Sequence, residues 1–222
     1  MKNIISVSVM CSDLMNLGAD IDLLNELGVD WLHVDVMDGH FVPNLTFGPD
    51  FIKAMHSRTS QPLDIHLMVT DPELVMSRFE LREGDSLTVH VELDRSFEEL
   101  SKRVRGQGCR FGLAVNPETP VEALERHIGL FDSITLMLVH PGYAGAKLVD
   151  GILDKVAVAR KWLDSNGLSD VLISVDGSVS AERAALMAGM GANIFVGGTA
   201  GIYRKGMDLR ETIPTFRKAI TL

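Results

Sequence analysis

The feature that most constrains this chain is a regular alternation, along its 222 residues, of short hydrophobic runs and longer amphipathic segments. Eight runs rich in β-branched and other apolar residues have the length and composition of buried strands. They are IISVSVM (4–10), WLHVDVM (31–37), LDIHLMV (63–69), SLTVHVE (86–92), RFGLAVN (110–116), SITLMLV (133–139), VLISVD (171–176) and ANIFVGG (192–198).

The segments between these runs carry apolar residues at helical spacing. Several open with Asp, Ser or Thr and close with Gly, which are helix start and stop signals. They include 13–28, 71–84, 96–108, 119–129, 148–167 and 180–191. Strands that are repeatedly followed by a helix pair in parallel, and eight such units in this length favour a closed barrel over an open doubly wound sheet. We therefore predict an α/β fold, a (β/α)8 TIM barrel, with residues 1–222 as one domain.

Composition narrows the classes of partner. The formal net charge of −9 argues against a surface for nucleic acid or anionic lipid, since such surfaces cluster Lys and Arg. A small anion is not excluded, because a pocket of backbone amides can hold one phosphate. No apolar run approaches the roughly 18 residues of a membrane span. Only Cys11 and Cys109 are present, so we expect inert thiols and a reducing, cytoplasmic location.

Four polar residues late in the predicted strands form the first candidate site. Alternate strand residues share a face, so His33 lies with Asp35, and His66 and Asp176 stand at corresponding positions on two other strands. Carboxyl ends of barrel strands gather functional groups. Two imidazole nitrogens and two carboxylate oxygens suit one divalent cation: Zn, Fe(II), Mn or Co. Taken singly, each histidine could instead hydrogen-bond within the barrel, and each aspartate could cap a helix. This alternative is less favoured when all four residues stand at matching strand ends.

Other residues near the strand ends fit proton transfer beside a ketone. Two aspartates on separate strands could act as general base and general acid on opposite faces of a substrate. Met37, Met68 and Met137 read equally well as core packing or as adaptable walls around a flat enolate. We expect His90 and Glu92 to support the site or the barrel rather than bind the cation. Glycine-rich turns after the sixth, seventh and eighth runs indicate a phosphate site: Gly142, Gly145, Gly177, Gly197 and Gly198.

Five motifs occur in order along the chain: HVDVMDGHFVPNLTFGP, LDIHLMV, GLAVNPETP, VHPGYAG and VDGS. On these residues the chain resembles the ribulose-phosphate 3-epimerase family over essentially its whole length. The resemblance implies a metal-dependent enzyme that inverts C3 of a ketose phosphate through a cis-enediolate, as in D-ribulose 5-phosphate to D-xylulose 5-phosphate. It implies metal binding by His33, Asp35, His66 and Asp176, with Asp35 and Asp176 as the acid/base pair.

The expected substrate contacts come from the same resemblance and from the glycine turns. They are Ser8, Met37, Met68, Met137, Gly142, Tyr143, Ala144, Gly145, Gly177, Ser178, Gly198 and Thr199. The resemblance also allows homo-oligomers, either dimers or hexamers.

Four departures from the family pattern concern the substrate. Val7 replaces a proline before Ser8, GYAGA replaces Gly-Phe-Gly-Gly-Gln, Ser178 replaces a glycine, and Thr199 stands where serine is usual. Several of these, with VMCSDL and NPETPVEAL, look like the D-allulose-6-phosphate 3-epimerase branch, whose substrate has one more carbon. Ala146 in place of glutamine would make room for it.

Two further readings remain beside these. A phosphosugar decarboxylase on a related barrel would want a lysine near the metal, and none of the eight runs carries one at its carboxyl end. A non-catalytic phosphosugar-binding barrel would keep the glycine loops but would have no need for two opposed aspartates. Neither the metal nor the choice between a pentulose and a hexulose follows from the sequence.

Overall fold

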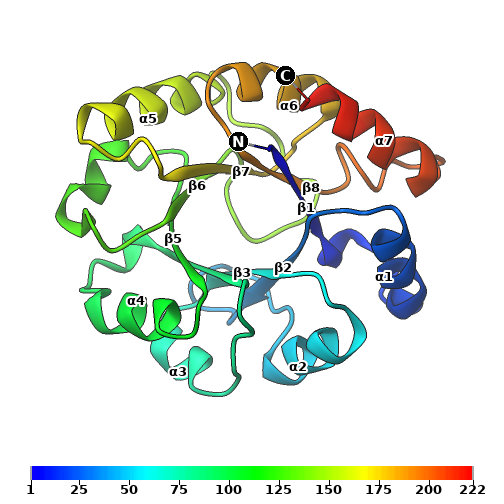
Figure 1. Ribbon diagram of the computed structural model, residues 1–222, viewed down its shortest axis with the longest axis horizontal. Coiled ribbons are helices and arrows are strands. Elements are labelled where there is room, and N and C mark those ends of the chain that lie inside the picture. The colour runs from blue at the N-terminus through cyan, green and yellow to red at the C-terminus, as the bar shows by residue number, and fades with distance from the viewer. Residues whose placement is uncertain (1, 222) are drawn as a thin grey trace.

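The computed structural model describes residues 2–221, and their strands form a closed barrel in which every neighbouring pair is parallel. Helices surround the strands on the outside (Figure 1). The predicted (β/α)8 architecture is confirmed. The strands are β1 (Ile4–Ser8), β2 (Trp31–Met37), β3 (Leu63–Met68), β4 (Ser86–His90), β5 (Arg110–Val115), β6 (Ser133–Met137), β7 (Leu172–Asp176) and β8 (Ile194–Gly197).

The helical layer differs more from the prediction. Its α-helices are α1 (Leu17–Glu26), α2 (Pro49–Arg58), α3 (Pro72–Met76), α4 (Glu98–Arg105), α5 (Asp154–Ser165), α6 (Ala181–Gly189) and α7 (Leu209–Ala219). Short 3-10 helices add η1 (Val9–Cys11), η2 (Val91–Leu93) and η3 (Val121–His127). The segments quoted from the sequence did not include α2 and α7. The predicted helix at 119–129 is instead the 3-10 helix η3, which begins directly after Pro120. A 3-10 helix rises more per residue than an α-helix, so a few residues cover the same length of the barrel surface.

Alternate side chains along each strand point either outward, toward the helices, or inward, into the barrel. Val34 and Val36 of β2 and Ile65 and Leu67 of β3 point outward into the main hydrophobic cluster under the helices. The residues between them point into the barrel, where the register pairs Asp35 with His66. Burial of the outward set stabilises the helix layer, because apolar area leaves water.

The barrel interior is apolar at one end and polar at the other. Trp31, Leu172 and Ile194, at the amino ends of their strands, form a separate buried cluster with Ile4 packed against it. Higher in the barrel only glycine fits at position 112, since a Cβ there would lie 2.5 Å from Thr88 Oγ1. No helix among residues 2–221 is long and apolar enough to cross a membrane.

Candidate active site

Four side chains from three strands meet at the floor of the carboxyl-terminal mouth. His33 and Asp35 of β2, His66 of β3 and Asp176 of β7 each offer one ligand atom, and these atoms all lie within 4.8 Å of one another. Asp35 Oδ1 is 3.1 Å from His33 Nε2 and 3.3 Å from His66 Nδ1. Asp176 Oδ2 is 3.8 Å and 3.6 Å from the same two nitrogens. The structure thus brings together the whole predicted ligand set.

One of these atoms lacks the partner that a buried polar group needs. His66 is fully buried, and its Nδ1 makes no hydrogen bond of acceptable geometry to any atom of residues 2–221. Leaving a buried nitrogen unsatisfied costs about 1–3 kcal/mol. A cation at the centre of the four groups would satisfy this nitrogen, and two nitrogens with two carboxylate oxygens are a normal donor set for a borderline divalent metal. The residues fit a metal.

His33 is held from outside the cluster by Asp64 and Ser6. Asp64 Oδ2 lies 2.8 Å from His33 Nδ1 and accepts a hydrogen bond of 2.9 Å from Ser6 Oγ. Because a carboxylate only accepts, His33 Nδ1 carries a proton, and Nε2 is the nitrogen that faces Asp35. Sequence reasoning missed this role of Asp64 and Ser6. The available signal was a second acidic residue two positions before His66.

Burial and close charges set the protonation of the metal-free cluster. Burial lowers the pKa of His33, but Asp35 and Asp64 outweigh burial and hold that pKa well above its usual range. Burial raises the pKa of Asp35, yet His33 and His66 together hold it well below the ordinary value. Burial also raises the pKa of Asp176, and there burial prevails. A bound cation would replace the imidazolium proton as the positive charge facing the carboxylates.

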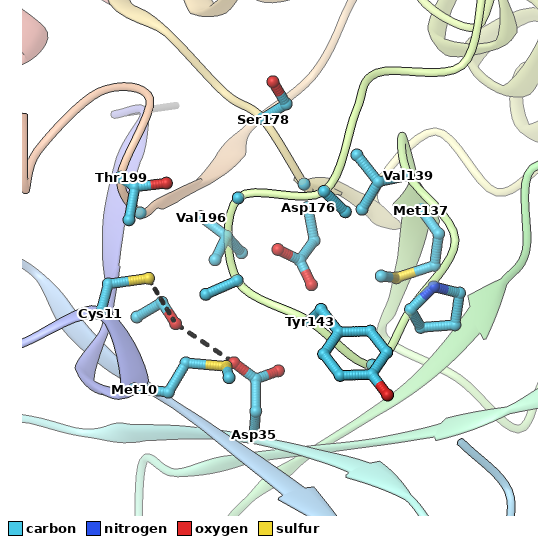
Figure 2. A pocket seen from close by; sticks show the side chains of 18 of the residues that line it. Met10, Cys11, Asp35, Met137, Val139, Tyr143, Asp176, Ser178, Val196 and Thr199 are labelled. Carbon is cyan, nitrogen blue, oxygen red and sulfur yellow. Dashed lines mark hydrogen bonds between the residues drawn. The ribbon is translucent and has the colours of Figure 1, made fainter. Parts of the chain in front are cut away.

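Above this cluster lies an open pocket, about 560 Å³ including the solvent space at its mouth. Figure 2 shows the carboxylates of Asp35 and Asp176 pointing into it. Its lining contains the twelve predicted substrate contacts Ser8, Met37, Met68, Met137, Gly142, Tyr143, Ala144, Gly145, Gly177, Ser178, Gly198 and Thr199. Gly197, also predicted for the phosphate site, is not part of this lining, because it ends β8 and a Cβ there would lie 2.4 Å from Ile202. Sequence reasoning missed three apolar residues of the lining, Met10, Val139 and Val196. Apolar side chains at strand ends cannot be told from core residues by sequence pattern alone.

The side chains of Ser8 and Cys11 lie next to Asp35 in the pocket. Ser8 Oγ donates a hydrogen bond of 3.1 Å to Asp35 Oδ2, as drawn in Figure 2. Cys11 Sγ lies 4.0 Å from the oxygen of the same hydroxyl. Burial raises the pKa of the Cys11 thiol, so it stays protonated. Cys11 and Cys109 are both free, so no disulfide joins them.

The loops after β6, β7 and β8 form the rim of the pocket. Gly177 has a φ of +102°, and a Cβ there would lie 2.5 Å from Val139. Ser178 is next to it with a φ of 53°, in the left-handed region that glycine prefers. Arg183 of α6 holds Ser178 in place by donating from Nη1 to its carbonyl oxygen at 2.7 Å and to its hydroxyl at 2.9 Å. The rim is built from backbone that can approach an anion closely.

Comparison with known proteins decides the family. The model of the ribulose-phosphate 3 epimerase family matches residues 4–202. The chain belongs to the ribulose-phosphate 3-epimerase family. As a member of this family it is an epimerase, an enzyme of the isomerase class. It is 37% identical to the ribulose-phosphate 3-epimerase of Bacillus subtilis over 213 residues, covering 96% of this chain and 97% of the relative. A Buchnera aphidicola ribulose-phosphate 3-epimerase is 34% identical and covers 99% of this chain and 95% of the relative.

Solved structures resemble this epimerase in fold. A phosphoribosyl anthranilate isomerase from Thermococcus kodakaraensis superposes with a TM-score of 0.63 at 14% identity, over 98% of each chain. A 3-hexulose-6-phosphate synthase gives a TM-score of 0.59 at 14% identity, over 100% of each chain. Identities this low support the barrel alone and carry no information about the reaction.

Proposed function

We propose that this epimerase is a metal-dependent ketose-phosphate 3-epimerase that interconverts D-ribulose 5-phosphate and D-xylulose 5-phosphate. The observation that carries the proposal is the pair Asp35 and Asp176, which enter one pocket from two separate strands, β2 and β7, beside two histidine nitrogens. The names of the curated relatives support the substrate.

The two aspartates would move the proton. One carboxylate removes the proton from C3 of the ketose, which leaves a planar enediolate, and the other returns a proton to C3 from the opposite face. The direction of reaction decides whether Asp35 or Asp176 acts first. A divalent cation held by His33, Asp35, His66 and Asp176 would stabilise the negative charge that develops on the substrate oxygens. Ser8 would orient the Asp35 carboxylate through its hydrogen bond.

The remaining lining would hold the substrate and exclude water. Met37, Met68 and Met137 are at most 5% exposed and lie near the ends of three strands, where their thioethers would contact the flat enediolate. The glycine-rich rim formed by the loops after β6, β7 and β8 would bind the phosphate through backbone amides.

A second substrate, D-allulose 6-phosphate, is favoured by the small side chain at Ala146, which lines the pocket. Ser178 and Thr199 line it too, so these three departures from the family pattern lie where they would contact a bound substrate. Val7 is different, because it is fully buried in the outer hydrophobic core and does not face the substrate.

The proposal is tested by competition between the two substrates. Purified, metal-reconstituted protein receives equal D-ribulose 5-phosphate and D-allulose 6-phosphate in deuterated water, and NMR follows deuterium entry at C3 of each. Faster exchange into the pentulose supports the proposed substrate, and faster exchange into the hexulose assigns the allulose phosphate instead. Exchange into neither would contradict both.

The roles of the aspartates need a variant. Asp176→Asn should lower turnover by about 10²- to 10⁴-fold, the usual contribution of a general acid or base. Phosphate binding, measured by calorimetry with inorganic phosphate, should survive because the rim is unchanged. A variant with undiminished turnover would contradict the assigned role.

A further inference from the structure

A row of buried side chains continues outward from His66, away from the candidate metal site. His66 Nε2 lies 2.9 Å from Nε2 of His90, the last residue of β4. His90 Nδ1 lies 3.0 Å from Glu92 Oε2, in the 3-10 helix η2 that follows. Both histidines are fully buried, and the Phe41 ring covers His90 at a centroid distance of 4.7 Å. Nothing in the proposed proton transfer uses His90 or Glu92.

The geometry fixes where each proton lies. Glu92 is anchored because its Oε1 accepts a hydrogen bond of 2.7 Å from the Asn116 backbone N–H. Burial raises the pKa of Glu92, but the bonds from His90 and Asn116 outweigh it and bring that pKa to about 2. A carboxylate can only accept, so His90 Nδ1 carries the proton that faces Glu92.

The position of the proton on His90 then determines the position of the proton on His66, a proposed metal ligand. With its proton on Nδ1, the neutral His90 ring offers a lone pair at Nε2, so His66 Nε2 must donate across the 2.9 Å contact. An imidazole that binds a metal is neutral and carries one proton, so a proton on Nε2 leaves His66 Nδ1 with a free lone pair. That atom is the buried nitrogen that lacks a hydrogen bond within residues 2–221 and faces Asp35 and Asp176.

We propose that His90 and Glu92 are positioning residues that fix the proton of His66 on Nε2 and so present His66 Nδ1 to a divalent cation. This inference rests on the proposed metal site and deepens it. The arrangement parallels that at His33, where Asp64 holds the proton on the outer nitrogen. Outer partners of this kind fix the tautomer and ring orientation of a metal-binding histidine, and their loss weakens metal binding by about 10- to 100-fold.

Three variants and one matched control test the role. His90→Phe keeps a ring against Phe41 but removes the acceptor for His66 Nε2–H. His90→Gln can return an acceptor through its amide oxygen, and Glu92→Gln leaves the packing intact while removing the charge that orients His90. His127→Phe is the control, because His127 is also a buried ring packed on a phenylalanine, with 5.1 Å between its centroid and that of Phe97, outside the metal-site residues.

Zinc affinity is measured by competition with a chromophoric chelator. We expect His90→Phe to weaken zinc binding by about 10- to 100-fold, Glu92→Gln to fall toward the lower end of that range, and His90→Gln to recover part of the loss. His127→Phe should bind zinc as the wild type does. Wild-type affinity in both His90→Phe and Glu92→Gln would overturn the inference while leaving the metal site standing. A wild-type chain that binds no zinc, cobalt or manganese would overturn the proposed function and this inference together.

A second readout does not depend on activity. Long-range ¹⁵N–¹H NMR of histidine-labelled protein reports which ring nitrogen carries a proton. We expect His90 to be protonated at Nδ1 and bare at Nε2, with and without zinc. A proton on His90 Nε2 would overturn the proposed order, because His66 Nε2 would then have to accept and the proton of a neutral His66 would lie on Nδ1, the nitrogen meant for the cation.

Discussion

Among single residues, Asp64 shows how a group outside the ligand set controls the metal site. Its carboxylate accepts from both His33 Nδ1 and Ser6 Oγ. In Asp64→Asn the amide can turn an N–H toward His33, which would move the histidine proton to Nε2, the nitrogen needed for the cation. We expect zinc affinity to fall by about 10- to 100-fold.

The matched control for Asp64→Asn is Ser6→Ala, which removes one hydrogen bond and leaves the carboxylate in place. Its zinc affinity should stay closer to that of the wild type. Chelator competition on both variants makes the measurement. Equal affinities for Asp64→Asn and the wild-type protein would show that His33 does not need Asp64 to choose its tautomer.

Ser178 is the other residue whose conformation carries a prediction. A non-glycine residue at a φ of 53° costs about 1 kcal/mol, which Ser178→Gly would relieve. The same change removes the hydroxyl that accepts from Arg183 at 2.9 Å. Since the Arg183 bond to the carbonyl oxygen remains, we expect the free energy of unfolding to change by less than about 1 kcal/mol. Urea denaturation would measure this, and a loss above about 2 kcal/mol would show that the hydroxyl contact dominates.

Among elements, the turn after β2 is tied to the end of β3 by Asp38. Its carboxylate accepts hydrogen bonds from the backbone N–H groups of His40, Phe41 and Thr70 and from the Thr70 hydroxyl. Burial raises the pKa of Asp38, but these bonds outweigh burial and lower that pKa to about 2. A depressed folded-state pKa stabilises the protein above the unfolded-state value near 3.8, and this stability is lost as the pH falls through about 2.

We therefore expect Asp38→Ala to lower the free energy of unfolding at pH 6 by about 1–2 kcal/mol, a modest figure because Asp38 is only partly buried. The difference from the wild type should narrow as the pH falls from about 4 toward 2. Urea denaturation across this range measures it, with Asp150→Ala, in an exposed loop, as the control. A difference that stays constant with pH would mean that the charged carboxylate does not anchor the turn.

Elements also show what the sequence could and could not predict. Every strand was found to within a few residues, because eight apolar runs with β-branched residues are a strong signal. Helix α2 buries only Ile52 and Met55 in ten residues, and α7 contains Pro214, which argues against a helix interior. Both were therefore missed by pattern alone.

The candidate site followed from alternation, since residues two apart on parallel strands reach the same mouth. His33, Asp35, His66 and Asp176 needed no further information. A supporting role for His90 and Glu92 was also predicted, but the atoms they contact were not, because those contacts depend on how neighbouring strands are staggered. His66 aligns with Thr88 of β4, so its contact with His90 lies one step up the next strand and follows only from the register.

For the whole molecule, the barrel holds a concentrated set of buried ionisable groups that a cation would neutralise. Asp35, Asp64, His33 and His66 are at most 6% exposed. A ligand that binds only the folded state at 100 times its Kd stabilises by about 2.7 kcal/mol, which for a chain of this size raises Tm by about 5–11 °C. We expect zinc or cobalt to produce such a shift in calorimetry and a chelator to reverse it.

Two variants separate the site from the rest of the barrel in this experiment. Asp176→Asn lacks one proposed ligand and should show a much smaller metal-induced shift, since a weaker Kd reduces the linkage at the same metal concentration. Asp150→Ala, in an exposed turn outside the pocket lining, should keep both the wild-type Tm and the wild-type shift. If Asp176→Asn retained the full shift, the stabilising metal would have to bind elsewhere on the chain, and the polar mouth of the barrel would need another occupant.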